Sequence, residues 1–101
     1  MDPQKAKAAF PELFHAIREV VYRHDPSGLF AISAPKDEHD DDVYRIISLL
    51  RHSRSMEEVP EVLDTVMGRW LSENPYASEE MWGSMAPEIW EAWKTFLEKA
   101  G

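Results

Sequence analysis

The chain has 101 residues, 44% of them hydrophobic and 30% charged, and this composition indicates one globular domain spanning residues 1–101. It contains no cysteine, which excludes disulfides, thiolate metal sites and a cysteine nucleophile, and no apolar run is long enough to span a membrane. The formal net charge is −8, so a nucleic-acid backbone would be repelled and a basic protein would be attracted.

An amphipathic helix is predicted first along the chain. Residues 3–9 fit a separate turn or a kinked extension of it, with Asp2 available as a cap. Pro11 suits the first turn of a helix, where a missing N–H costs no hydrogen bond, and the helix should run to about His24. Its apolar residues recur at three- and four-residue steps and are Phe10, Leu13, Phe14, Ile17, Val20 and Val21.

The sequence DPSG at 25–28 predicts a turn that ends this helix. Asp25 can accept hydrogen bonds from the backbone that follows, Pro26 fixes φ, and Gly28 permits a positive φ. The connection that follows, up to about residue 37, is long, and its apolar residues predict an ordered loop packed over the other helices. These residues are Leu29, Phe30 and Ile32.

Two further helices are predicted in the middle of the chain. The second runs from Glu38 or Asp40 to His52, with an inward stripe of Val43, Ile46, Ile47 and Leu50. The sequence SMEE at 55–58 matches a capping box, in which Ser55 binds the Glu58 amide and Glu58 reaches back. It opens a third helix, whose stripe is Val59, Leu63, Val66, Met67, Trp70 and Leu71.

The last quarter of the chain predicts a short helix and a longer one. SENP at 72–75 ends the third helix, because a residue before proline avoids the α region. A short helix is expected from Ser78 to about Met85, and Pro87, suited to a first turn, predicts a separate last helix over 87–100. The fold class is therefore all-α: a compact bundle of four main helices plus a short helix, with a long ordered loop between helices 1 and 2.

The stretch APKDEHDDD at 34–42 is the most acidic in the chain. Asp37 or Asp40 can cap the second helix, whose dipole favours acids in its first turn. Three consecutive aspartates, Asp40, Asp41 and Asp42, exceed what capping needs and are candidates for partner binding. A calcium loop would need a central glycine, and the four histidines lack the spacing of metal ligands. We therefore expect neither a metal nor a cofactor.

Residues 25–50, DPSGLFAISAPKDEHDDDVYRIISLL, resemble a family of small bacterial helical proteins of unknown function. The motif of that family is Asp-Pro-x-Gly-Leu, a short apolar link, then Ala-Pro-x-Asp-Glu-Tyr, and His39 stands here where tyrosine is more common. The matching residues are Asp25, Pro26, Gly28, Leu29, Ala34, Pro35, Asp37 and Glu38. Some members resemble immunity proteins encoded beside bacterial toxins, and the resemblance implies the same role here.

The composition of this motif also predicts a role in structuring the loop. Turn residues, prolines and acids are the residue types that fix a connection, with Asp37 and Glu38 holding the entry of the second helix or pairing with Arg45 or Arg23. The loop-structuring candidates are Asp25, Pro26, Gly28, Pro35, Asp37 and Glu38.

Catalytic motifs are lacking, and we predict that the protein is not an enzyme. No serine lies in a nucleophile motif, and the four glycines form no phosphate-binding loop. His15, with Glu12 and Glu19 on the same helix, is the nearest match to a base with an orienting carboxylate, although such a histidine is more often structural.

Acids and tryptophans concentrate in the second half of the chain. Residues 1–54 hold nine acids against eight bases, a balance of −1, and residues 55–101 hold ten acids against three bases, a balance of −7. Four tryptophans lie within 24 residues there: Trp70, Trp82, Trp90 and Trp93. They either fill the core of a small bundle or form an exposed patch with an acidic rim.

These features predict a small acidic, cytoplasmic module that binds a basic protein, with acids that steer encounter and tryptophans that anchor the complex. Its specific form is an immunity or inhibitor protein that neutralises a basic bacterial toxin. The partner-binding candidates are Asp40, Asp41, Asp42, Glu79, Glu80, Glu88, Glu91, Trp82 and Trp90. The alternative is a self-associating, homodimeric structural protein, and ligand binding between helices would require a cavity.

Overall fold

The computed structural model describes residues 3–26, 28, 35–74 and 77–100. Six α-helices occur in these ranges, and two single 3-10 turns, Lys36–His39 (η2) and Met56–Glu58 (η3), precede the third and fourth of them. The helices are α1 (Pro3–Ala9), α2 (Pro11–His24), α3 (Asp40–Leu50), α4 (Val59–Met67), α5 (Trp70–Glu73) and α6 (Glu79–Ala100). No strand occurs in the described part of the chain, and the all-α prediction is confirmed.

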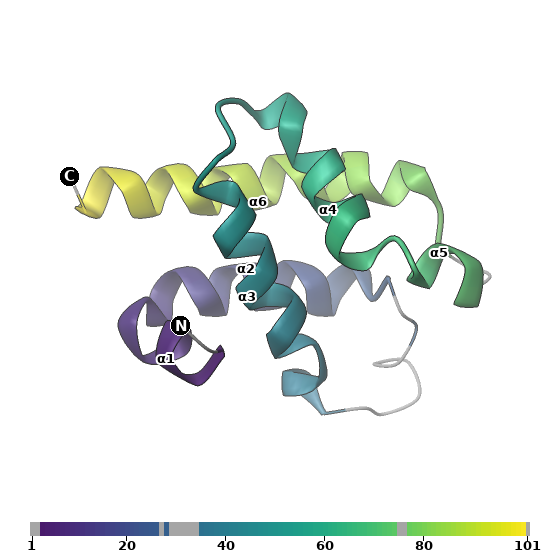
Figure 1. The fold of residues 1–101 in the computed structure, drawn as a ribbon, viewed down its shortest axis with the longest axis horizontal. Coiled ribbons are helices and arrows are strands. Elements are labelled where there is room, and N and C mark those ends of the chain that lie inside the picture. Colours follow the sequence, from purple (N-terminus) through teal and green to yellow (C-terminus); the bar gives the residue numbers. More distant parts are fainter. Residues whose placement is uncertain (1–2, 27, 29–34, 75–76, 101) are drawn as a thin grey trace.

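The two longest helices, α2 and α6, lie side by side and antiparallel; α3 crosses in front of α2, and α4 lies in front of α6 (Figure 1). The apolar stripes predicted for the first two helices form the centre of the core, because each lies on the face of its helix that meets the others. The fully buried large side chains include Phe14, Ile17, Ile46, Leu50, Leu63, Met67, Met85 and Ile89.

The predicted signals at helix ends are confirmed at two places. Pro11 is the first residue of α2, and Asp25 ends that helix in the left-handed conformation, with φ 50° and its N–H donated to the Val21 carbonyl. The capping box is present at Ser55 and Glu58, and Glu58 accepts the Ser55 N–H at 3.0 Å.

The separate helices predicted on either side of Pro87 are wrong, because α6 continues through this proline as one helix of 22 residues. Proline inside a helix removes one hydrogen bond and presses on the carbonyl four residues earlier, here that of Gly83. Both residues are exposed, so the Gly83 carbonyl can bind water. The helix persists because its opposite face is buried in the core, through Trp82, Met85, Ala86, Ile89 and Trp93.

The third predicted helix is also divided differently. It was expected to run from the capping box through Leu71, but α4 ends at Met67, and α5 begins at Trp70 after a bend at Gly68 and Arg69. A Cβ at Gly68 would lie 2.4 Å from the carbonyl oxygen of Asp64, so this bend requires glycine. The bend directs Arg69 back toward α3, where it takes part in the cluster described below.

The prediction that Leu29, Phe30 and Ile32 pack the long loop over the helices lies outside the described residues. Among the helices that are described, none has the combination of length and apolar composition needed to cross a membrane.

Candidate functional site

The first of the three consecutive aspartates, Asp40, binds two cations from other helices. Its carboxylate accepts the Arg18 Nε and Nη2 atoms at 2.9 and 2.6 Å, and Lys7 Nζ lies 2.8 Å from Oδ2. Burial acts to raise the pKa of Asp40, but the hydrogen bonds and charges of Arg18 and Lys7 outweigh it and hold the pKa below its ordinary value. This carboxylate therefore joins α3 to α1 and α2.

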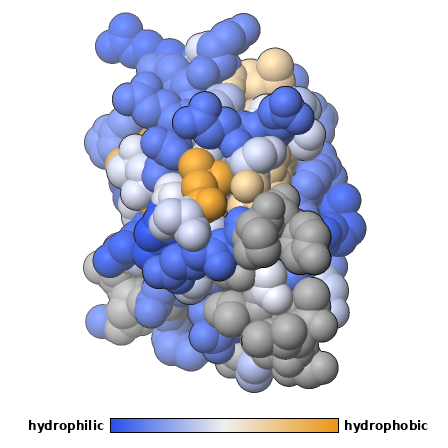
Figure 2. All heavy atoms as spheres, turned by 90° about the vertical axis from the view of Figure 1, so that its right-hand side faces the viewer, coloured by the Kyte–Doolittle hydropathy of each residue, from blue (hydrophilic) through white to orange (hydrophobic). Residues whose placement is uncertain are grey.

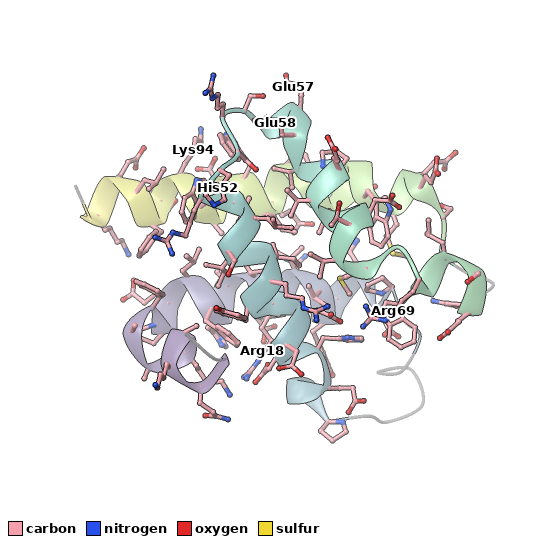
Figure 3. The ribbon with its side chains drawn as sticks, in the orientation of Figure 1. Arg18, His52, Glu57, Glu58, Arg69 and Lys94 are labelled. Carbon is pink, nitrogen blue, oxygen red and sulfur yellow. The ribbon has the colours of Figure 1, made fainter. Side chains whose placement is uncertain are left out.

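The third of the consecutive aspartates, Asp42, lies in the interior with a side chain only 5% exposed. It accepts the Nδ1 of His39 at 2.9 Å, and Arg69 Nη2 lies 3.3 Å from both of its oxygens. Burial acts to raise the pKa of Asp42, but the His39 hydrogen bond and the Arg69 charge overcome it, so the pKa lies below its ordinary value. We call Asp42, His39 and Arg69 the α3 clamp (Figure 3 labels Arg69).

The prediction that Asp40 caps α3 is wrong, because Asp40 is the first residue of the helix and its carboxylate binds Arg18 and Lys7. The alternative cap, Asp37, has a side chain that lies outside the described residues. The N-cap residue of α3 is His39, whose side chain binds Asp42 instead of a backbone amide. Of the three consecutive aspartates only Asp41 is exposed. Two of the aspartates at this helix start therefore form contacts with Arg18, Lys7 and Arg69. These cations lie far from the aspartates in the sequence, so the sequence alone does not reveal the contacts.

The α3 clamp contains an imidazole oriented by a carboxylate, the arrangement that activates a catalytic base. His39 is only 3% exposed, however, and its ring packs edge-on against Trp70 with centroids 5.6 Å apart, so no surface substrate reaches it in this structure. His15, the nearest match in the sequence, is exposed on α2. In the described ranges no group of three histidines or acids has the geometry to hold a metal ion.

The loop-structuring residues at the end of α2 are held by Asn74, which the sequence predicted only as the end of the third helix. Asn74 is 5% exposed, and its side-chain amide donates to the Pro26 carbonyl at 2.9 Å and lies 3.5 Å from the Asp25 carbonyl. Gly28 has φ 75° and donates its N–H to the Asp25 carbonyl at 3.0 Å. A Cβ on Gly28 would meet the Asn74 amide at 3.3 Å, so the glycine also makes room for this contact.

The second half of the motif forms the η2 turn. The Pro35 carbonyl accepts the Glu38 N–H at 3.0 Å, which closes the turn that leads into α3. Glu38 is exposed and forms no ion pair with any described residue, while Arg23 binds Glu88, so the predicted pairing of Glu38 with Arg23 or Arg45 is wrong. Asp37 belongs to the same turn, and its side chain lies outside the description.

The tryptophans contribute mainly to the core. Trp82 and Trp93 are 3% and 7% exposed, and Trp90 and Trp70 are half-buried against the same core. Trp82 was predicted to anchor a partner, but its indole faces inward from α6 and is not accessible at the surface. Asp42 is excluded from a partner surface for the same reason.

Several acids on α4, on α5 and in the first turn of α6 are exposed and have no cation within ion-pair distance among the described residues. We call them the acidic set: Glu61 and Asp64 on α4, Glu73 on α5, and Glu79 and Glu80 in the first turn of α6. Figure 2 looks onto the end of the molecule where α5 and the start of α6 lie, and shows a mainly hydrophilic surface around a small hydrophobic area. The surplus negative charge of the second half is thus exposed to solvent.

The two remaining acidic candidates, Glu88 and Glu91, line a groove of about 1030 Å³ between α2 and α6. Glu88 lies 2.6 Å from both Arg23 Nη2 and His24 Nε2. The hydrogen bond with His24, and after it that with Arg23, holds the pKa of Glu88 below its ordinary value. Glu91 is paired with Lys94 at 3.7 Å. Both acids therefore have cations beside them, unlike the acidic set.

Comparisons of the chain with protein-family models, with curated proteins and with solved structures found no match. The resemblance of residues 25–50 to small bacterial helical proteins stays a prediction.

Proposed function

We propose that the protein is a binding module that captures a basic protein through the acidic set. The observation that carries this proposal is the contrast between two groups of acids. The aspartates at the start of α3 are largely neutralised by Lys7, Arg18 and Arg69, whereas the acidic set has no such partners among the described residues.

An exposed surplus of one charge has a physical consequence for association. It raises the local concentration of a basic partner and accelerates encounter by a factor of about 10–1000, an effect that falls steeply with ionic strength. The specific form of the proposal is an immunity or inhibitor protein that covers the basic surface of a bacterial toxin. The resemblance of residues 25–50 to small bacterial helical proteins supports this form.

Partner capture from the native host tests the proposal. Tagged protein is incubated with host extract at low and at high salt, and bound proteins are identified by mass spectrometry. We expect one stoichiometric basic protein that is retained at low salt and released at high salt. The double variant Glu79→Gln/Glu80→Gln should weaken this capture.

A matched control distinguishes an effect of the acidic set on capture from an effect of the total net charge. Glu38→Gln/Glu98→Gln removes the same two charges from exposed glutamates elsewhere, and it should leave capture unchanged. Equal loss in the two variants, or a bound protein that resists high salt, would refute the assignment to the acidic set.

A further inference from the structure

The groove between α2 and α6 lies on the side of these helices that faces away from α3. Arg18, on the opposite side of α2, binds Asp40 of α3, whereas Ala16 opens into the groove. The apolar lining includes Phe10, Ala16, Ala92 and Phe96, which are half-buried, and Leu13 and Val20, which are buried. Ala16 and Ala92 are the small side chains that leave the space between the helices unfilled, so an apolar strip is open to solvent.

The charges at the corners of the groove alternate in sign. At one end Glu12 of α2 binds Lys99 of α6 at 3.1 Å, and at the other end Arg23 of α2 binds Glu88 of α6 at 2.6 Å. At these corners each helix therefore presents one acid and one base, and the two helices present them in opposite order. A third acid of the lining, Glu91 of α6, is paired with Lys94 on its own helix.

This alternating pattern is complementary to itself. A two-fold axis along the groove places Glu12 opposite Lys99 of a second copy and Arg23 opposite Glu88. An axis across the groove places Glu12 opposite Arg23 and Lys99 opposite Glu88. In both cases every corner meets the opposite charge, the self-complementarity that a two-fold interface requires. None of the acidic set lines the groove, so this face avoids the surplus charge that would repel a second copy.

The area of the face suits a weak dimer. Helix α2 has 14 residues and a length of about 21 Å, and two adjacent helices of about 10 Å diameter give a face of roughly 400 Å² before its corrugation is counted. A standard interface buries about 800 Å² per partner, and smaller ones are weak. We propose that the groove between α2 and α6 binds the same groove of a second copy of this chain, with a dissociation constant in the micromolar range.

Sedimentation velocity of the full chain, from about 1 μM to about 500 μM, tests the proposal on a scale that brackets micromolar affinity. We expect a monomer–dimer equilibrium that persists at high salt, because its centre is apolar. The Glu79→Gln/Glu80→Gln variant should dimerise like the native chain, which separates this surface from the acidic set. A chain that stays monomeric at every concentration would overturn the proposal and leave the groove to a helix of another protein.

Variants in the groove identify the surface. Thr95 is an exposed residue at its edge, so Thr95→Arg should weaken the dimer about tenfold or more without unfolding the helix, and Ala16→Arg should do so from the opposite wall. Thr65→Arg is the matched control, since Thr65 is also exposed but lies on α4. Circular dichroism confirms that each variant is folded. Folded Thr95→Arg and Ala16→Arg variants that dimerise as well as Thr65→Arg would place the dimer contact elsewhere and refute the proposal.

The charge pattern has a test of its own. Glu12→Lys puts a cation opposite Lys99 or Arg23 of the second copy, whichever two-fold axis applies, and we expect it to weaken the dimer about fivefold or more. A Glu12→Lys dimer as tight as that of the native chain would contradict the argument from charge.

Discussion

The α3 clamp predicts a large difference between two neighbouring aspartates. Asp41 and Asp42 both lie in the first turn of α3, so the interaction with the helix dipole is similar for the two. Only Asp42 is buried, where its carboxylate binds His39 and Arg69. Replacement of each by asparagine keeps the shape of the side chain and removes its charge. The difference between the variants therefore isolates the contribution of the clamp.

The magnitude follows from the contacts of Asp42. A hydrogen bond to a charged group contributes about 1.5–3 kcal/mol. The ion pair with Arg69 adds less than a buried pair would, because the Arg69 side chain is 49% exposed. Asparagine still accepts one hydrogen bond, so we expect Asp42→Asn to lower the free energy of unfolding by about 2–3 kcal/mol. For a domain of this size that corresponds to a Tm lower by roughly 10–20 °C. Asp41→Asn should stay within about 0.5 kcal/mol of the native chain.

Urea unfolding of the two variants at neutral pH provides the measurement. Equal losses for Asp41→Asn and Asp42→Asn would show that Asp42 contributes no more than any acid in a first turn. That result would refute the reasoning from the clamp.

The same clamp has a pH dependence whose sign is fixed by the direction of the pKa shift. The pKa of Asp42 is lowered in the folded state from an ordinary value of 3.8. Its ionised form therefore stabilises the fold above pH 3.8, and this stabilisation disappears as the pH falls through the folded-state pKa. We expect the stability gap between the native chain and Asp42→Asn to narrow as the pH falls below 3.8. A gap that is unchanged in acid would contradict this assignment.

Three further substitutions test the fold, each by thermal or urea unfolding. Asn74→Ala should cost about 1–3 kcal/mol, because the buried Pro26 carbonyl loses its donor, and an unchanged stability would contradict a role for Asn74 in holding the loop. Gly28→Ala should cost about 1–2 kcal/mol, because φ is 75° and the new Cβ would press on Asn74; a neutral result would mean that the turn relaxes at no cost. Pro87→Ala should raise stability by up to about 3 kcal/mol, because the Gly83 carbonyl regains its hydrogen bond, and a loss would show that the proline ring contributes packing of its own.

The predictions from the sequence that are confirmed rest on local rules. The apolar stripe of α2, the turn after His24 and the capping box at Ser55 each depend on residues within one or two turns of one another. A periodicity of three to four residues and the backbone preferences of proline and glycine are sufficient to specify such features.

The features that the sequence did not predict depend on contacts between distant segments. The local preferences of proline predict that a helix ends before Pro87. Burial of the inner face of α6 against α2 and α4 outweighs the hydrogen bond that Pro87 cannot donate to the Gly83 carbonyl. The pairing of Asp42 with Arg69 spans 27 residues, and Asn74 reaches Pro26 across 48. The sequence predicted helix ends at Asn74 and before Pro87, and partner binding for Asp42. Only the tertiary structure supplies the contacts that these residues make within the chain.

The distribution of charge separates the two proposals experimentally. The acids of the first half are largely used within the fold, as Asp40 and Asp42 show, so most of the net charge available to a partner lies on the acidic set. Interactions between exposed charges are screened over about 10 Å at 0.1 M salt. Added salt should therefore release a basic protein from the acidic set. It should hardly affect a dimer formed at the apolar groove, because attraction between the corner charges and repulsion between the two acidic chains are both screened by salt. Loss of the basic protein without loss of the dimer, in the same preparation, would assign the two activities to two surfaces, whereas parallel responses to salt would mean that one surface serves both.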